Sequence, residues 1–268
     1  LPNESRNIID IYPLGFLPYI GSDAYDRSFV TGIKGKVAEW DVDFSNAYGQ
    51  NQFDFSVLNS VNASLGKASP TNFYAGGPKF TQNTTNIDFS KGFDWLSGAN
   101  LAFGGEFRYE NYQLRPGDQN SYANYGLARQ VGVDGSGNPI LVPDFSGSVN
   151  TLFGPDGSPR PGGAQVFPGY RPENAVNANR TAASIYADGE FNFSKAFLVN
   201  AAVRYENYSD FGSTTNGKVA ARYKLNKNFT VRASASTGFR APSLQQRYYA
   251  STSTVFTSGV PAEVGTFP

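Results

Sequence analysis

Carboxylate side chains recur at close spacing in two segments, and paired carboxylates can act as a general acid and a general base. Asp41 is followed by Asp43, and Glu106 is followed on the same strand face by Glu110. Arg108 stands between the two glutamates, so solvation of a polar surface and ion pairing are the favoured roles. The chain has no His and no Cys, the usual bases, nucleophiles and transition-metal ligands. We therefore expect no enzyme, no metal site and no cofactor.

Four basic residues near the C-terminal end form a second group. Lys218, Arg222 and Lys224 alternate along one segment, and Arg232 lies on the next. An odd-length turn at 226–228 would place Arg222 opposite Arg232. Like charges in direct opposition are unfavourable, so we expect an acidic partner or an anion near them. Carboxylates elsewhere in the same protein are the favoured partner, and an anionic substrate is the alternative.

The overall composition favours strands and turns. Aromatic residues make up 15% of the chain and Gly numbers 29, a bias typical of β-proteins. Lys plus Arg and Asp plus Glu both number 22, so no basic field points to nucleic acid. The chain begins at Leu1 and contains no Met, which indicates a processed product or a fragment. No apolar run reaches the roughly 18 residues of a membrane helix, so any membrane crossing would use strands.

Alternation of apolar and polar residues predicts eight strands. The clearest is FLVNAAVRYENY, in which Phe197, Val199 and Val203 share one face while Arg204 and Glu206 share the other. The predicted strands cover 27–37, 40–50, 81–91, 99–112, 181–194, 197–210, 217–226 and 228–239. The charged residues expected on the polar faces, and hence in the lumen of a barrel, are Glu106, Arg108, Glu110, Arg204, Glu206, Lys218, Arg222, Lys224 and Arg232.

Aromatic residues bracket the apolar faces, which we expect to carry no charge. Trp40 and Tyr48 are separated by the same interval as Phe197 and Tyr205. That interval is about 26 Å of strand, or about 20 Å of height at a tilt of about 40°. Outer-membrane barrels have an apolar band of this kind between aromatic girdles. The girdles favour a transmembrane barrel over a soluble β-sandwich, which alternation alone would also allow.

Short and long connections alternate along the chain. Long outer loops are predicted at about 51–80 and 113–180, on the rim opposite the short turns, as in outer-membrane barrels. The segment VLNSVNASL, 57–65, is placed inside the first loop, because a ninth spanning strand would exchange the two rims. The second loop is rich in Gly and Pro, so it should contain turns rather than long elements. Its aromatic residues are expected mainly to pack the loop, and a ligand-binding surface is the alternative.

Several segments together resemble the barrel of TonB-dependent outer-membrane receptors. The runs RYENYSDFGSTTNGKVAARY and RASASTGFRAPSLQQRYYASTS carry most of the resemblance, and LAFGGEFRYENYQ and GGAQVFPGYRPEN fit the same pattern. YPLGFLPYI, SLGKASPTNFYAGG and TQNTTNIDFS look most like receptors of the Bacteroidetes type. The resemblance implies an all-β, antiparallel transmembrane barrel of about 22 strands closed around a plug domain. Residues 1–268 would be an interior part of that barrel domain, with the plug domain absent.

The same resemblance implies a function in the bacterial outer membrane. Such a receptor binds and imports a scarce nutrient, for example a ferric siderophore, a cobalamin or an oligosaccharide. Its partners would be TonB, reached through the missing plug domain, outer-membrane lipid, the nutrient and accessory surface lipoproteins. A passive porin-like channel is the alternative, and a soluble β-sandwich adhesin is a less favoured one.

The motif GFRAPSL is expected to end the last predicted strand. Phe239 would lie at the outer girdle and Arg240 would point inward near the mouth. Pro242 has no N–H for the strand ladder, so pairing should stop there. Substrate contacts are expected at Phe167, Tyr170, Arg171 and Arg240.

Overall fold

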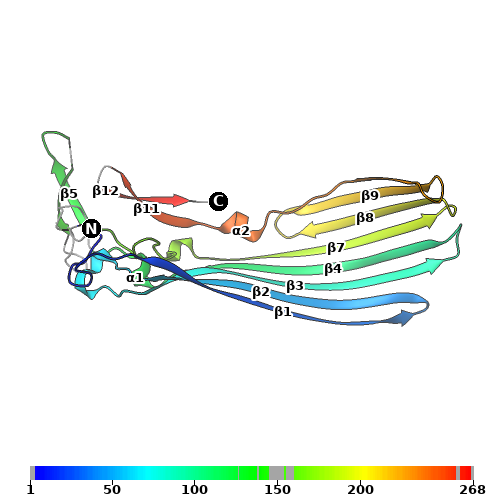
Figure 1. The fold of residues 1–268 in the computed structure, drawn as a ribbon, viewed down its shortest axis with the longest axis horizontal. Coiled ribbons are helices and arrows are strands. Elements are labelled where there is room, and N and C mark those ends of the chain that lie inside the picture. The colour runs from blue at the N-terminus through cyan, green and yellow to red at the C-terminus, as the bar shows by residue number, and fades with distance from the viewer. Residues whose placement is uncertain are drawn as a thin grey trace.

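Eight strands form one antiparallel sheet in the computed structural model, in the order β1-β2-β3-β4-β7-β8-β9-β10 (Figure 1). The structure describes residues 4–125, 127–137, 139–144, 154, 160–257 and 260–266. The sheet is open, with β1 and β10 at its edges. Within the described residues, no helix has the length and apolar character needed to cross a bilayer. The strands of the sheet are β1 (Tyr19–Val37), β2 (Trp40–Leu58), β3 (Phe73–Phe93), β4 (Ala99–Arg115), β7 (Val176–Asn192), β8 (Phe197–Tyr208), β9 (Gly212–Lys224) and β10 (Thr230–Ser236).

All eight predicted strands are present, but six are longer than the alternation indicated. The first predicted loop, 51–80, is wrong at both ends, because β2 continues to Leu58 and β3 starts at Phe73. The true connection contains a 3-10 helix, η1 (Ala63–Ala68), and 57–65 adds no ninth strand, as expected. The second predicted loop, 113–180, is likewise too long, since β4 ends at Arg115 and β7 begins at Val176.

The shorter elements lie in or after the long connections. The connection between β4 and β7 contains α1 (Gln119–Tyr122), the hairpin of β5 (Leu127–Val133) and β6 (Pro139–Asp144), and η2 (Pro172–Asn174). After β10 come α2 (Leu244–Tyr248) and the hairpin of β11 (Ser251–Thr257) and β12 (Val260–Thr266). These segments gather toward the end of the sheet opposite the short turns (Figure 1).

One face of the sheet is apolar near the short turns and carries contacts between aromatic rings. The Trp40 ring lies 5.2 Å from Phe103 and 6.0 Å from Phe93, and Phe197 lies 6.2 Å from Tyr223 between ring centroids. The expectation that this face is free of charge is wrong. Lys91 pairs with Leu101 and therefore lies on the same face as the aromatic rings. Its ammonium reaches Glu39 in the β1–β2 turn at 2.6 Å, so the charge leaves the apolar band by way of a long side chain.

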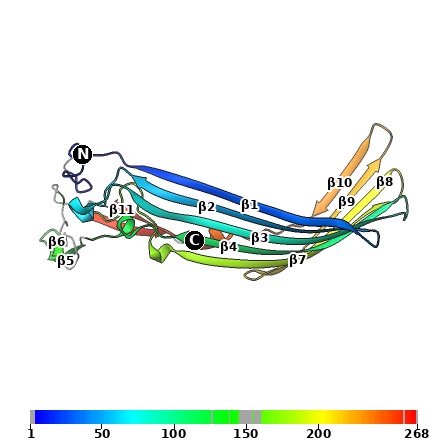
Figure 2. The same cartoon turned by 90° about the horizontal axis from the view of Figure 1, so that it is seen from below.

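The same face becomes polar further from the short turns. Gln50 pairs with Thr81, Gln52 pairs with Lys79, and Asn111 pairs with Asn179. From Tyr48 to Leu58, β2 adds about 33 Å of strand beyond the second aromatic row. The long strands therefore continue well past the apolar band, and Figure 2 shows β1 to β4 extending far beyond β8, β9 and β10. This continuation is why hydrophobic alternation missed the strand ends: both faces are polar there, so no period of two is visible.

Compact packing holds the connections at that end. Val57, Val61 and Ala63 are fully buried, and Phe73 is almost so. Asn62 is also fully buried, and its amide nitrogen donates to the carbonyls of Asn120 and Ala123 at 2.8 Å each. Its amide oxygen accepts from the N–H and hydroxyl of Ser64. The β2–β3 and β4–β7 connections are thus joined through one buried amide.

The GFRAPSL motif departs from the predicted arrangement. β10 ends at Ser236, not at 239, and it begins at Thr230. Phe239 does not close an outer girdle on the strand. Its ring instead packs 6.1 Å from Tyr208 and 6.5 Å from Phe211, at the turn between β8 and β9. The chain has left the ladder before Pro242, because among the described residues the last backbone hydrogen bond between this segment and β9 runs from Thr237 N–H to the Gly217 carbonyl.

Candidate functional site: the charged face of the sheet

All nine charged residues predicted to line a lumen lie on one face of the sheet, opposite the apolar face. Strand register shows this directly, because Ser184 pairs with both Glu106 and Glu206, and Arg180 pairs with Glu110. The alternation was therefore read with the correct phase on every strand that carries these residues. The residues on this face are Glu106, Arg108, Glu110, Arg204, Glu206, Lys218, Arg222, Lys224 and Arg232.

Arg204 is the centre of one ion-pair group on this face. Its Nε donates to Glu206 at 2.7 Å, and its Nη2 lies 3.3 Å from Glu106. The Tyr208 hydroxyl donates to the other oxygen of Glu206 at 3.2 Å. These predicted lumen residues therefore neutralise one another across β4, β7 and β8, which suits a polar wall better than a pair of catalytic carboxylates.

A second, more buried group centres on Arg180, which the sequence analysis missed. The Arg180 side chain is 4% exposed, and its Nη2 and Nε lie 2.7 and 2.8 Å from Glu110. Its Nη1 donates to the carbonyl of Pro242 at 2.9 Å and lies 3.7 Å from Asp210. Its guanidinium also lies over the Tyr208 ring, 5.7 Å from the centroid. The segment Ala178-Arg180-Ala182 could have revealed this position, had the alternation been extended into the supposed loop.

The segment that follows β10 completes this group. Arg247 on α2 contacts Asp210 and lies over the Phe211 ring, 4.9 Å from its centroid. Leu244 is 1% exposed and packs against the buried Tyr112 and Leu114 of β4. α2 is capped at its start, since the Ser243 hydroxyl accepts from Gln246 N–H and the Gln246 side chain accepts from Ser243 N–H. A folded turn thus covers part of the charged face.

Three of the four predicted substrate-contact residues, Phe167, Tyr170 and Arg171, lie together, and Arg240 lies on the segment after β10. Tyr170 is 7% exposed in the cluster with Tyr112 and Leu244, and its hydroxyl lies 3.3 Å from that of Tyr249. Burial and this hydrogen bond raise the pKa of the Tyr170 hydroxyl above its ordinary value. Phe167 is half-buried and packs 5.6 Å from Tyr170, and Arg171 is half-buried. Only Arg240 is exposed, so ligand contact by this set stays a prediction.

The basic pair at the short-turn end has the predicted geometry. Arg222 and Arg232 are direct neighbours across β9 and β10. The Nε of Arg222 is buried and has no hydrogen-bond partner among the described residues. A groove on this face is lined by both arginines together with Glu190, Asn192 and Asn200. An anionic group inserted into the groove would relieve the repulsion between the arginines.

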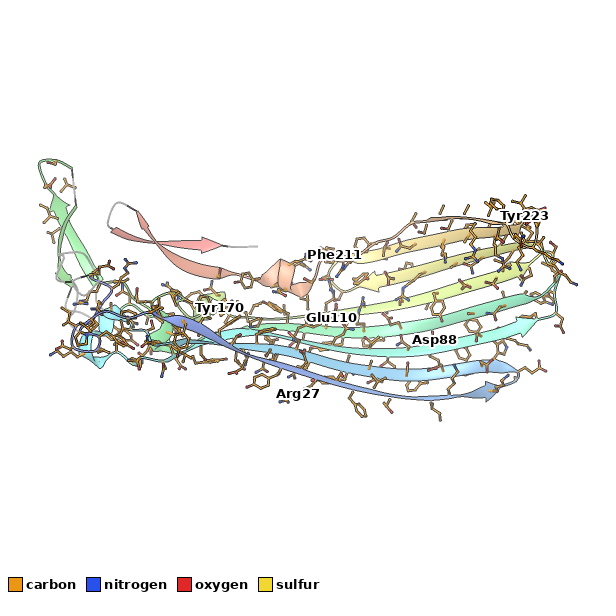
Figure 3. All side chains as sticks on the ribbon, in the orientation of Figure 1. Arg27, Asp88, Glu110, Tyr170, Phe211 and Tyr223 are labelled. Carbon is orange, nitrogen blue, oxygen red and sulfur yellow. The ribbon has the colours of Figure 1, made fainter. Side chains whose placement is uncertain are left out.

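These groups are spread along the sheet. Figure 3 shows Glu110 and Phe211 midway along the long axis, Tyr170 toward the long connections, and Tyr223 at the short-turn end. The Arg180 group and the basic pair therefore lie at different depths of the charged face.

Comparison with known proteins adds a family to this geometry. A family model described as "TonB dependent receptor-like, beta-barrel" matches residues 19–266. A solved structure titled "Structure of the RagAB peptide transporter" is similar with a TM-score of 0.52 at 9% identity, covering 94% of this chain and 26% of that chain. The ferric-catecholate import receptor Fiu from K12 E. coli is similar with a TM-score of 0.42 at 15% identity, covering 89% of this chain and 38% of that one. No curated protein matches the chain.

The likeness to the first structure shows the fold alone, because the sequence identity is only 9%. The chain spans 26% of that structure's length. An open sheet of eight strands agrees with such a share, because barrels of this size class need many more strands to close.

Proposed function

Because the chain belongs to the TonB-dependent receptor-like β-barrel family, we propose that it forms part of the barrel of an outer-membrane receptor that imports a scarce nutrient with energy supplied through TonB. The whole of 1–268 belongs, in this proposal, to one barrel domain whose plug lies elsewhere in the protein. The nutrient is a ferric siderophore, a cobalamin or an oligosaccharide.

The observation that carries the proposal is the two-faced sheet. Aromatic and aliphatic side chains such as Phe103, Phe107 and Val203 are 43%, 52% and 49% exposed on one face, which would be costly in water and is favourable against lipid. The other face holds ion pairs suited to a wet interior. A soluble β-sandwich would bury the apolar face against a second sheet, and the described residues contain no second large sheet.

The orientation follows from the unequal connections. In the proposed receptor the short turns face the periplasm, and the connections between β2 and β3 and between β4 and β7 face outward. A nutrient then meets the outer connections first, near Tyr170 and Arg240, and accessory surface lipoproteins would contact the same side. The groove at Arg222 and Arg232 lies deeper, where plug carboxylates are the favoured partner and an anionic nutrient is the alternative.

A deletion strain tests the proposal. Cells that lack the complete gene should lose growth on one scarce nutrient, and the intact gene should restore growth only in a TonB-positive background. Uptake that persists without TonB would favour the passive porin-like channel. A protein that remains folded and monomeric in buffer without detergent would contradict the membrane location altogether.

A further inference from the structure

The chain that follows β10 folds back over the charged face. Residues 237–250, here called the strap, include α2, which contacts β4 and β7. In Figure 1, α2 lies past the ends of β8 and β9 that are nearer the long connections. Leu244 is the point of deepest contact, at 1% exposure, between Tyr112, Leu114 and Tyr170.

The strap is held by few apolar contacts. Leu244 is its one buried hydrophobic residue among those described. Phe239 and Tyr249 remain 45% and 36% exposed, and Arg240 and Gln245 are exposed as well. Its only helix spans Leu244–Tyr248. Segments with so little buried area open at a much lower cost than the strands beneath them.

A polar contact supplies the rest of the attachment. Asp210, in the turn between β8 and β9, accepts a hydrogen bond from Arg247 of the strap. The same carboxylate oxygen lies 3.7 Å from Arg180, whose Nη1 also donates to the Pro242 carbonyl. Asp210 therefore lies between the guanidinium of Arg180 on β7 and the guanidinium of Arg247 on the strap. Removing its charge would weaken the contact of both guanidinium groups with this side chain, while Arg180 would keep Glu110.

Two tyrosines lie beneath the strap. Tyr112 is 1% exposed, and its hydroxyl is buried without a hydrogen-bond partner among the described residues. Tyr170 is 7% exposed, and its hydroxyl meets that of Tyr249 on the strap. A buried hydroxyl without a partner is unfavourable, so lifting the strap would recover hydration for Tyr112. It would also open Tyr170 to the space above the charged face.

We propose that residues 237–250 form a strap that must lift from the charged face before a ligand can reach Tyr112 and Tyr170, and that Asp210 is the latch that holds it down. The ligand step rests on the proposed uptake function. The docking of the strap and its release through Asp210 do not, because both are properties of the protein alone.

Thiol labelling tests the strap in the complete protein in native membranes. This chain has no Cys, and any Cys elsewhere in the complete protein is first replaced by Ser. Single cysteines are then introduced at Leu244 on the strap and, separately, at Leu114 of β4 beneath it. With Asp210 intact, Leu244→Cys and Leu114→Cys should react with a small polar maleimide far more slowly than the exposed Gln245→Cys. Adding Asp210→Asn should raise both rates by about tenfold, the effect of weakening one hydrogen bond to a charged group.

Asp188→Asn is the matched control. Asp188 lies on the same face of β7, eight residues along the strand from Arg180, and accepts from Asn200 at 2.9 Å, so this variant should leave both labelling rates unchanged. Fast labelling at 244 and 114 with Asp210 intact would show that the strap is not docked, and slow labelling in Asp210→Asn would show that Asp210 is not the latch. Either result overturns the proposal. No nutrient is present in this experiment, so its outcome stands apart from the growth test of uptake.

Discussion

Arg180 on β7 and Glu110 on β4 form a buried ion pair, with the Arg180 Nη2 2.7 Å from a Glu110 carboxylate oxygen and the two side chains 4% and 11% exposed. The pair joins neighbouring strands beyond the apolar band. Removing one partner leaves a buried charge without compensation, which typically costs about 3–5 kcal/mol. The pair therefore contributes to order in the outer part of the wall.

Replacing Arg180 should show this cost. Arg180→Leu should lower the free energy of unfolding of the complete receptor in detergent by about 3–5 kcal/mol, measured by denaturant titration. Lys36→Leu, which removes an exposed pair with Asp41 at 3.7 Å, should cost no more than about 1 kcal/mol. Equal losses for the two variants would mean that Glu110 is solvated in the native protein.

The face assignment predicts a contrast between adjacent positions on β8. A fluorophore attached at Val203→Cys should be quenched by a lipophilic quencher dissolved in the bilayer, and one at Ala202→Cys should not, because neighbours in a strand point to opposite faces. Fluorescence in reconstituted vesicles measures this. Similar quenching at both positions would contradict the membrane orientation of the sheet.

A charge on the apolar face should be costly. Val203→Arg should destabilise the receptor by about 2–4 kcal/mol if the side chain lies near the middle of the bilayer. Thr230→Arg, on the charged face next to Lys224, should cost much less, and the comparison is made by unfolding in lipid vesicles. A smaller loss for Val203→Arg than for Thr230→Arg would argue against lipid contact at β8.

The β4–β7 connection should divide into a removable part and a packed part. An epitope inserted near Gly135, in the turn of the β5–β6 hairpin, should be detected on intact cells, and deletion of 127–144 should leave the barrel assembled. Deletion of 160–170 should not, because Ala164 and Tyr170 are 2% and 7% exposed. Surface immunodetection and heat-modifiable gel mobility give the two readouts. An epitope visible only after the outer membrane is opened would invert the proposed rims.

Asn62 should hold two connections together. Asn62→Leu removes the donor to the carbonyls of Asn120 and Ala123, and each buried group left unpaired costs about 1–3 kcal/mol. Limited proteolysis should therefore cut the 116–126 region much faster in this variant. Asn179→Leu changes an exposed amide and should leave the cutting rate unaltered. Equally faster cutting in both variants would show that Asn62 does not hold the β2–β3 and β4–β7 connections together.

Sequence patterns predicted the part of the fold that lies in the apolar band. There the contrast between Val203 and Arg204, repeated from strand to strand, established the face of the nine charged residues predicted for the lumen, although not that of Lys91, and the interval 226–228 placed Arg222 opposite Arg232. Past the band, segments such as GQNQ are polar on both faces, so alternation gave no signal and the strand ends were assigned to loops.

The candidate site was harder to predict, because its contacts join distant parts of the chain. Arg180 was assigned to the end of a loop, Asp210 was assigned to the end of a strand although it lies in a turn, and Arg247 lies in no strand pattern. These residues come together because the chain turns back over the charged face after Ser236, and strand alternation does not encode that turn. The burial of Tyr170 depends on the same fold-back. Its aromatic ring alone could equally indicate an exposed contact or a packed one, and packing is what the structure shows.

The unequal strand lengths give the proposed pore an oblique entrance. β3 has 21 residues and β10 has 7, which correspond to about 70 Å and about 23 Å of strand. In an upright barrel, the rim over β1–β4 would stand far above the cell surface, whereas the rim near β10 would lie close to the lipid headgroups. Molecules diffusing in from the medium would first contact the tall rim over β1–β4. Molecules moving along the bacterial surface would enter over the short rim near β10, beside the strap.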